Sequence, residues 1–189
     1  NEDGPTDRFD DLVQTNLMGT YYCCRAAIRH FGSSSSPRHI VAISSILGRF
    51  GVPGYTGYCA SKTGILGLVR ALALEVAADG IQVNAICPGP FLTPMNESIA
   101  NTEEGMKFIV GATALNRWGE LREIQGAAIF LASDASEFIT GSQFTVDGGI
   151  TVGPRHSWDE SAGGPVLEAL GITPEQAEQM AEAMKAQQE

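Results

Sequence analysis

Three short strand-like runs alternate with long helical segments, and this alternation limits the chain to a small set of folds. The runs cover residues 38–44, 81–86 and 141–149, and the segments between them are much longer than hairpin turns. Connections of that length join parallel strands through crossover helices, whereas antiparallel strands can be joined by two residues. The sequence therefore predicts an α/β fold in which helices cover a parallel sheet.

The helical segments differ in how regular their apolar pattern is. Residues 7–31 repeat apolar side chains at the spacing of one helix face, and residues 58–80 form a second, more apolar helix pattern. Residues 96–115 have the pattern of irregular helix, and residues 120–133 that of a cleaner one. We expect the two long helices to cover the sheet.

The size and composition of the chain predict one globular domain with a tail. The chain has 189 residues, and 43 % of them are hydrophobic. We expect the α/β domain to cover residues 1–152 and an acidic extension to cover residues 153–189. Within the extension, Thr173 and Gln176 have the spacing of a capping box, which predicts a short helix there.

The net charge of the chain limits the classes of partner that it is expected to bind. The net charge is −10, whereas nucleic acids and anionic membranes attract basic surfaces. No apolar run has the length of a membrane span and no secretory leader opens the chain, so we expect a cytoplasmic protein. Four cysteines without a CxxC motif and three scattered histidines predict reduced thiols and no metal site.

Tyr58 and Lys62 form a candidate acid–base pair. They are four residues apart at the start of a predicted helix, so they share one helix face. Free tyrosine has a pKa of about 10, and a nearby ammonium favours its phenolate form. Such a phenol can give a proton to a carbonyl oxygen or take one from an alcohol. Ordinary surface residues also have this spacing, so the pair alone does not establish a function.

Polar and glycine residues follow the first two predicted strands. Ser44 and Ser45 end the run at residues 38–44, where a hydroxyl could bind a substrate oxygen. Pro88 and Gly89 follow the next strand and allow backbone to come close to a ligand. Because ligands of parallel sheets lie beyond the carboxyl ends of the strands, these residues and Tyr58 can converge on one crevice.

Five motifs occur in the order and at the spacing of a known family. They read TNLMGTYYCCRAA, IVAISS, YCASK, VNAICPGPFLTPM and FTVDGG. Over residues 7–150 the chain resembles the C-terminal two-thirds of a short-chain dehydrogenase/reductase, with most likeness to 3-oxoacyl-acyl-carrier-protein reductases and sugar or polyol dehydrogenases. The resemblance implies a Rossmann-like, doubly wound parallel sheet. It also implies hydride transfer between NAD or NADP and a small carbonyl or alcohol substrate.

The resemblance implies a catalytic role for four residues. Tyr58 is expected to be the general acid/base. Lys62 is expected to lower the pKa of that phenol and to hold the nicotinamide ribose. Ser45, thirteen residues before Tyr58, is expected to orient the substrate oxygen. Asn16 is expected to kink its helix and to hold a water that links Lys62 to solvent.

The same resemblance implies the binding residues. Pro88 and Gly89 are expected to border the nicotinamide, and the Phe91 backbone and Thr93 to bind its carboxamide end and the nearby phosphate. The substrate is expected to contact Ser45, Leu47, Tyr55, Tyr58 and Met95. Family members use the helices matching residues 7–31 and 58–78 to assemble, so we expect a homodimer or homotetramer.

Several neighbouring residues have simpler interpretations. Tyr55 lacks a lysine four residues on, because position 59 is a cysteine, and we interpret it as pocket wall. Ser44 could be the polar end of the strand and Ser45 part of the loop, although the spacing to Tyr58 favours Ser45 as a functional residue. Asn84 and Asp147 are expected to support loops. Arg49 and Arg117 are either surface groups or contacts for an anionic substrate.

One departure from the family pattern concerns the cofactor cradle. The chain contains no GxGxxG or GxxxGxG motif, which the family carries in its N-terminal half together with the NAD or NADP selector. We therefore expect an incomplete sheet and interpret the chain as a fragment of a longer oxidoreductase that binds dinucleotide poorly by itself. The alternative interpretation is a non-catalytic interaction module that retains the oligomerisation helices.

Overall fold

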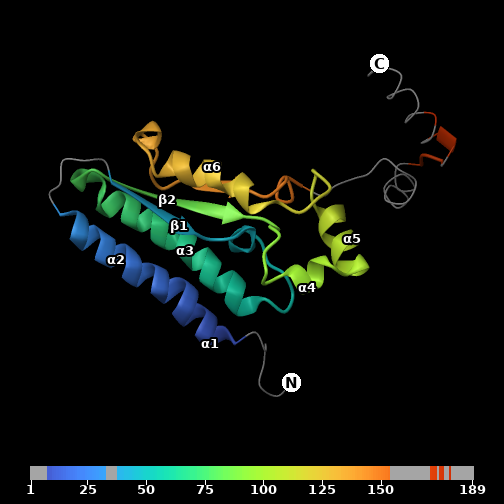
Figure 1. Cartoon of the computed structure of the whole chain (residues 1–189), viewed down its shortest axis with the longest axis horizontal. Coiled ribbons are helices and arrows are strands. Elements are labelled where there is room, and N and C mark those ends of the chain that lie inside the picture. The colour runs from blue at the N-terminus through green and yellow to red at the C-terminus, as the bar shows by residue number, and fades with distance from the viewer. Residues whose placement is uncertain (1–7, 33–37, 154–170, 174, 177–178, 180–189) are drawn as a thin grey trace. The chain divides into compact units, whose positions relative to one another are not determined.

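A computed structural model describes residues 8–32, 38–153, 171–173, 175–176 and 179 (Figure 1). The chain divides into two compact units, Asn1–Thr151 and Val152–Glu189. The described helices of the larger unit are α1 (Phe9–Leu12), the π-helix η1 (Val13–Met18), α2 (Gly19–Phe31), the 3-10 helix η2 (Ile46–Gly48), α3 (Thr56–Glu75), the 3-10 helix η3 (Ala77–Asp79), α4 (Glu97–Ala100), α5 (Glu103–Ala112), α6 (Leu121–Leu131) and the 3-10 helix η4 (Asp134–Ser136).

The described strands form one parallel sheet. They are β1 (Arg38–Ile43), β2 (Ile81–Pro88) and β3 (Gln143–Val146), in the spatial order β1-β2-β3. Helices α2 and α3 lie on one side of the sheet and α6 on the other (Figure 1). The predicted α/β architecture with parallel strands is therefore confirmed. The first strand is one residue shorter than expected, and the second runs two residues further.

The core lies between α3 and the sheet. Ile65 and Val69 of α3 and Val83 and Ala85 of β2 have no exposed surface. Because β2 is the middle strand, helices cover both its faces, and most of its residues are buried without the alternation of a half-exposed strand. This buried strand directs its carboxyl end, and the residues that follow it, to the edge of the sheet where the candidate site lies.

A glycine of α3 lies where the first helical segment packs against that helix. A Cβ built on Gly64 of α3 would lie 2.7 Å from Cδ2 of Leu17, which belongs to η1. A larger residue at this position would require the end of the Leu17 side chain to move. The close packing brings the π-helix against the first turns of α3.

The predicted capping box in the smaller unit is present. The Thr173 backbone N–H donates to Oε1 of Gln176 at 2.9 Å, and the Gln176 N–H donates to Oγ1 of Thr173 at 3.3 Å. None of the helices in the described ranges combines the length and the hydrophobicity of a membrane-spanning segment. The described side chains also include no group of three or more His, Cys, Asp or Glu placed to hold a metal ion.

Candidate active site

The first turns of α3 bring Tyr58 and Lys62 together. The Lys62 ammonium lies over the Tyr58 ring, 5.7 Å from its centroid, and donates a hydrogen bond to the Ile43 carbonyl at 3.1 Å. Burial of the Lys62 side chain lowers the pKa of its ammonium. The four-residue spacing therefore forms a spatial pair, and the lysine ties that pair to the end of β1.

Ser45 lies two residues after the end of β1 and is buried. Its Oγ accepts a hydrogen bond from the Leu47 backbone N–H at 3.1 Å and so caps η2. The neighbouring Ser44 has a different role, because its hydroxyl donates to the Lys62 carbonyl at 2.8 Å. A Cβ on Gly48 would lie 2.9 Å from that same carbonyl oxygen, so glycine is needed where η2 meets α3. Together these contacts fix the end of β1 against the first turns of α3.

Asn16 lies inside the π-helix η1. Its Nδ2 donates to Oγ of Ser61 at 3.1 Å, and the Ser61 hydroxyl donates to the Tyr58 carbonyl at 2.8 Å. Thr20 donates its hydroxyl to the Asn16 carbonyl at 2.6 Å. The irregularity expected at Asn16 is a widened helical turn, a feature that often accompanies functional sites. Sequence reasoning missed Ser61, although a polar residue at a buried position of an apolar helix was the available signal.

The segment after β2 crosses close to the end of β3. The Gly89 N–H donates to the Val146 carbonyl at 2.9 Å, and a Cβ on Gly89 would lie 2.6 Å from Cα of Asp147. Pro88 is the last residue of β2 and is partly buried. The Pro88–Gly89 step therefore lets two backbones approach each other, which a larger residue in place of the glycine would prevent.

Phe91 is anchored to the loop that precedes α6. Its side chain is buried, and the backbone around it pairs with Gly119 as an isolated parallel bridge. In this bridge the Leu92 N–H donates to the Gly119 carbonyl and the Gly119 N–H donates to the Pro90 carbonyl, each at 2.9 Å. The bridge holds the Phe91 backbone in one place relative to the sheet.

Thr93 and the Phe91 carbonyl share one partner, Asn96. The Thr93 N–H donates to Oδ1 of Asn96 at 2.8 Å and the Thr93 hydroxyl donates to the same oxygen at 3.1 Å. Nδ2 of Asn96 donates to the Phe91 carbonyl at 2.7 Å. The groups expected to bind the nicotinamide carboxamide thus bind a carboxamide in this structure, so their chemistry fits that end of the cofactor. Sequence reasoning missed Asn96.

The expected substrate contacts are not all brought together. Tyr55 packs edge-on against Tyr58, with 6.5 Å between ring centroids, and is 49 % exposed. Leu47 in η2 is half-buried next to Ser45. Met95 is 93 % exposed, so it forms no part of a buried wall. Tyr55 and Leu47 therefore belong to the neighbourhood of Tyr58 and Ser45, whereas Met95 lies on the surface.

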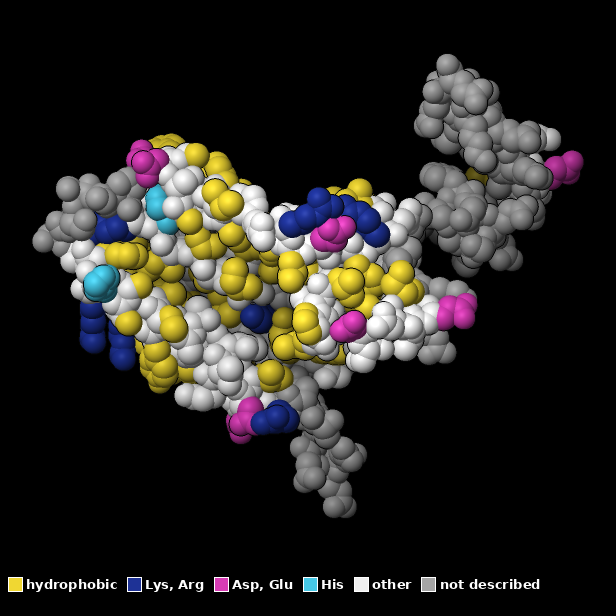
Figure 2. Space-filling view, in the orientation of Figure 1, with side chains coloured by type: hydrophobic (Ala, Val, Ile, Leu, Met, Phe, Trp, Pro, Cys, Tyr) yellow, Lys and Arg dark blue, Asp and Glu magenta, His cyan; other side chains and the backbone are white. Residues whose placement is uncertain are grey.

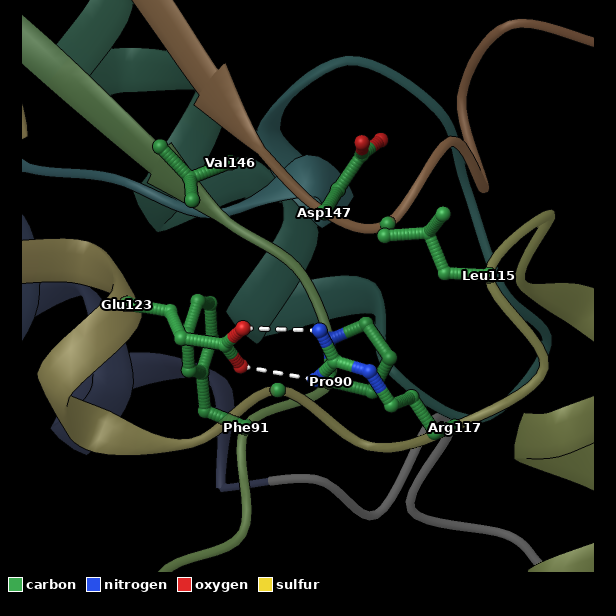
Figure 3. Close-up of a pocket in the computed structure, with 9 residues that line it drawn as sticks. Pro90, Phe91, Leu115, Arg117, Glu123, Val146 and Asp147 are labelled. Carbon is green, nitrogen blue, oxygen red and sulfur yellow. Dashed lines mark hydrogen bonds and ion pairs between the residues drawn. The ribbon is translucent and has the colours of Figure 1, made fainter.

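A pocket of about 110 Å³ lies beyond the ends of β2 and β3 (Figure 3). Its lining includes Pro90, Phe91, Arg117, Glu123 and Asp147, but not Ser45, Tyr58 or Lys62. Arg117 and Glu123 point toward each other across it and form two hydrogen bonds of 2.7 Å. The hydrogen bond from Arg117, together with one from the Glu120 backbone N–H, lowers the pKa of Glu123 to about 2. Arg117 is held in this ion pair with Glu123, which links the loop before α6 to that helix.

The second arginine considered from the sequence, Arg49, reaches across the sheet end. Its Nη1 donates to Oγ1 of Thr145 in β3 at 2.7 Å. Thr145 is the register partner of Cys87, whose thiol is buried. Burial raises the pKa of the Cys87 thiol. Arg49 therefore braces the carboxyl ends of the strands, and Cys87 is a packed residue of the core.

Comparison with known proteins identifies what the chain is similar to. The profile of the family described as "Enoyl-(Acyl carrier protein) reductase" matches residues 2–151. The 3-oxoacyl-[acyl-carrier-protein] reductase FabG of Haemophilus influenzae is 41 % identical over 140 residues, which are 74 % of this chain and 57 % of the relative. The glucose 1-dehydrogenase of Gluconobacter oxydans is 38 % identical over 151 residues, or 80 % of this chain and 57 % of the relative.

Solved structures of dehydrogenases have the same arrangement of helices and strands. A 4-hydroxyisoleucine dehydrogenase complexed with NADH matches with a TM-score of 0.75 and 32 % identity, covering 79 % of this chain and 62 % of that one. A gluconate 5-dehydrogenase from Burkholderia cenocepacia in complex with NADP and tartrate matches with a TM-score of 0.73 and 33 % identity, covering 78 % and 57 %.

These matches agree on the family and on the extent of the likeness. The chain spans little more than half the length of the curated relatives that it matches. The match with the family profile covers most of the α/β unit, including both long helices and all three strands. The sheet and its flanking helices align with dehydrogenases of the Rossmann-like type. The chain belongs to the short-chain dehydrogenase/reductase family.

Proposed function

We propose that the protein containing this chain interconverts a carbonyl and an alcohol with NAD or NADP, and that Tyr58 is its general acid/base. The observation that carries the proposal is the Lys62 ammonium, held over the Tyr58 ring by a hydrogen bond to the end of β1. A positive charge in this place can stabilise negative charge that develops on the phenol oxygen during the reaction. Membership of a family of nicotinamide-dependent dehydrogenases supports the same chemistry.

Each site residue has a task in this reaction. Tyr58 gives its proton to the substrate oxygen during reduction and takes one from it during oxidation. The Ser45 oxygen already accepts a hydrogen bond from the Leu47 N–H, which leaves the hydroxyl proton to be donated to the substrate oxygen. The Asn16–Ser61 link holds the turn of α3 that carries Tyr58. These contacts orient the two hydroxyls before substrate arrives.

The cofactor assignment rests on the segment after β2. When bound, the nicotinamide carries the hydride, and the protein supplies orientation and charge. The Phe91 carbonyl and the Thr93 N–H and hydroxyl would hold its carboxamide, and Lys62 would hold its ribose. The Phe91 carbonyl and the N–H and hydroxyl of Thr93 already form hydrogen bonds with the side-chain carboxamide of Asn96. The described residues that we assign to cofactor binding would therefore all contact the nicotinamide end of the cofactor.

The experiment is a comparison of Tyr58→Phe with Tyr55→Phe in the polypeptide encoded by the complete open reading frame. Both substitutions remove one phenol hydroxyl from the same cluster of rings. With a panel of small ketones and sugar alcohols, Tyr58→Phe should lower kcat at least about a hundredfold, because general acid–base catalysis contributes that much. Tyr55→Phe should retain most of the rate. A Tyr58→Phe enzyme with the wild-type kcat would falsify the proposal.

A second candidate function is assembly without catalysis. Phe9 of α1 and Tyr22 of α2 are 44 % and 43 % exposed, and apolar side chains gather in the middle of the face shown in Figure 2. Exposed aromatic groups on a helix surface are typical of an interface between copies of one chain. This candidate is favoured if the complete protein is a stable dimer or tetramer by light scattering and transfers no hydride to any member of the panel.

A further inference from the structure

Asn96 occupies the groups on which nicotinamide binding would depend. We propose that the Asn96 side chain is an internal competitor for the nicotinamide carboxamide and thereby sets the affinity of this site for the cofactor. The inference rests on the function proposed above, because it takes Phe91 and Thr93 as the carboxamide subsite. It assigns a role in cofactor binding to a residue outside the motifs YCASK and CPGPFLT.

The orientation of the Asn96 amide follows from its partners. Oδ1 faces two donors of Thr93, its N–H at 2.8 Å and its hydroxyl at 3.1 Å. Nδ2 faces the Phe91 carbonyl at 2.7 Å. A backbone N–H can only donate and a carbonyl can only accept, so a flipped amide would lose the bonds to both backbone groups. The subsite is therefore complementary to a primary carboxamide in one orientation, and nicotinamide carries the same group.

The two sides of this contact differ in how firmly they are held. Phe91 is buried and bridged to Gly119 on both sides of its backbone. Asn96 is half-buried, follows the almost fully exposed Met95, and precedes α4, which has only four residues. A ligand that enters the subsite would displace the Asn96 side chain and leave Phe91 in place. The contact can thus open without disturbing the sheet.

Asn96 and nicotinamide would compete because both need the same backbone proton of Thr93. The Thr93 N–H carries a single proton and already donates it to Oδ1 of Asn96. A nicotinamide carboxamide oxygen can accept that proton only after Oδ1 has left. Because the protein contacts are lost when the ligand contacts form, the net gain on binding is smaller than it would be at an empty subsite. The adenosine half of the cofactor is unaffected by this exchange.

The test measures binding by the complete protein rather than its activity. Dissociation constants for NADH, NADPH and ADP-ribose, which lacks nicotinamide, are measured calorimetrically for the wild type, Asn96→Ala and Asn96→Asp. Asn96→Ala should bind the preferred reduced cofactor about tenfold more tightly, as expected when hydrogen bonds of ordinary strength no longer compete. Asn96→Asp keeps the acceptor for Thr93 but replaces the donor to the Phe91 carbonyl by a second acceptor, so its affinity for that cofactor should lie between those of the wild type and Asn96→Ala. ADP-ribose affinity should stay within about twofold in both variants.

The controls separate competition from a structural role. Asn101→Ala removes the same side chain from an exposed position five residues on, and it should leave all dissociation constants unchanged. In a two-dimensional NMR spectrum, the side-chain amide signals of Asn96 should shift on saturation with the cofactor and not with ADP-ribose. If Asn96→Ala weakens cofactor binding, or changes cofactor and ADP-ribose binding equally, Asn96 is a scaffold and the inference is wrong. ADP-ribose binding also reports whether each variant is folded.

The inference and the proposed function fail in different ways. If the wild-type protein binds neither NADH nor NADPH under any condition, the proposed function is wrong and the competitor role falls with it. If the wild type binds one of them and the three variants do not separate as stated, the function stands and only the role of Asn96 is overturned. If the Asn96 amide signals of the wild type do not shift on saturation with the cofactor, the role of Asn96 is likewise overturned and the proposed function stands.

Discussion

At the scale of single residues, the Lys62 ammonium lies in an environment that differs from that of a free lysine. Its ammonium donates to the Ile43 carbonyl and lies over the Tyr58 ring, and burial removes part of its hydration. A buried charge costs free energy unless its partners replace the lost water, and a carbonyl and a ring replace it only in part. The folded chain therefore binds this proton less tightly than the unfolded chain does.

This shift predicts how Lys62 affects stability as pH changes. Below the lowered folded-state pKa, both states are protonated and the folded state carries the full cost of the buried charge. Between that pKa and the ordinary value of 10.5, the unfolded chain keeps a proton that the folded chain has released, so the free energy of unfolding rises with pH. Relative to Lys62→Met, the wild type should gain stability on going from neutral pH toward 10.5.

The measurement is urea unfolding of both proteins at a series of pH values. Subtracting the Lys62→Met curve from the wild-type curve cancels the titration of the other lysines, tyrosines and cysteines. A difference that is flat across this window, or one that falls as pH rises, would contradict a lowered Lys62 pKa.

At the scale of elements, the π-helix η1 and α3 are joined by a short polar link. Asn16 donates to Ser61, and Ser61 donates to the Tyr58 carbonyl. In a double-mutant cycle, Asn16→Ala and Ser61→Ala should show a coupling of about 1 kcal/mol in the free energy of unfolding, the usual value of one such hydrogen bond. The cycle with Thr15→Ala in place of Asn16→Ala should give no coupling, because Thr15 is exposed on the same element.

The start of α6 provides a second prediction at this scale. The pKa of Glu123 is lowered to about 2 from the ordinary 4.5, so its contribution to stability is complete above pH 4.5 and is lost as pH falls toward 2. Glu123→Gln should therefore be less stable than wild type at neutral pH and approach it near pH 2. Because both side chains are partly exposed, added salt should shrink the difference at neutral pH.

Thermal unfolding scans of the two proteins measure this difference directly. A matched variant is Glu137→Gln, which removes one exposed carboxylate outside this ion pair and controls for the loss of one negative charge. An acid-stability profile of Glu123→Gln that runs parallel to wild type would show that the ion pair contributes nothing to folding.

The elements also show where sequence reasoning succeeds and where it stops. The strand at residues 38–44 and the Tyr58–Lys62 pair could be predicted, because strand composition and helical spacing are local properties. The π-turn around Asn16 could only be expected as an unspecified kink, and its contact with Ser61 joins residues that are far apart in the sequence. Asn96 was missed because its role depends on where the backbone after β2 is held by Gly119.

At the scale of the whole molecule, the described sheet has an edge beside β1 with no further described strand. Within the described residues β1 pairs only with β2, and Ile43 at its end is 50 % exposed. An open apolar edge pairs readily with other chains. The purified 189-residue polypeptide should therefore self-associate in a concentration-dependent way, as measured by light scattering. A His39→Pro variant should self-associate less than the wild type, because the substitution removes one backbone donor of β1.

The distribution of cofactor contacts gives the last prediction. Phe91, Thr93 and Lys62 are proposed to hold the nicotinamide end, and the sequence contains no GxGxxG or GxxxGxG motif to hold the pyrophosphate. In calorimetric titrations, the 189-residue polypeptide should bind nicotinamide mononucleotide about as weakly as NAD, with dissociation constants on the order of 1 mM. The adenosine half adds affinity only where the protein contacts it, so the polypeptide of the complete open reading frame should prefer NAD or NADP over the mononucleotide by a large factor. Micromolar binding of NADH or NADPH by the 189-residue polypeptide would show that its own residues complete the cradle.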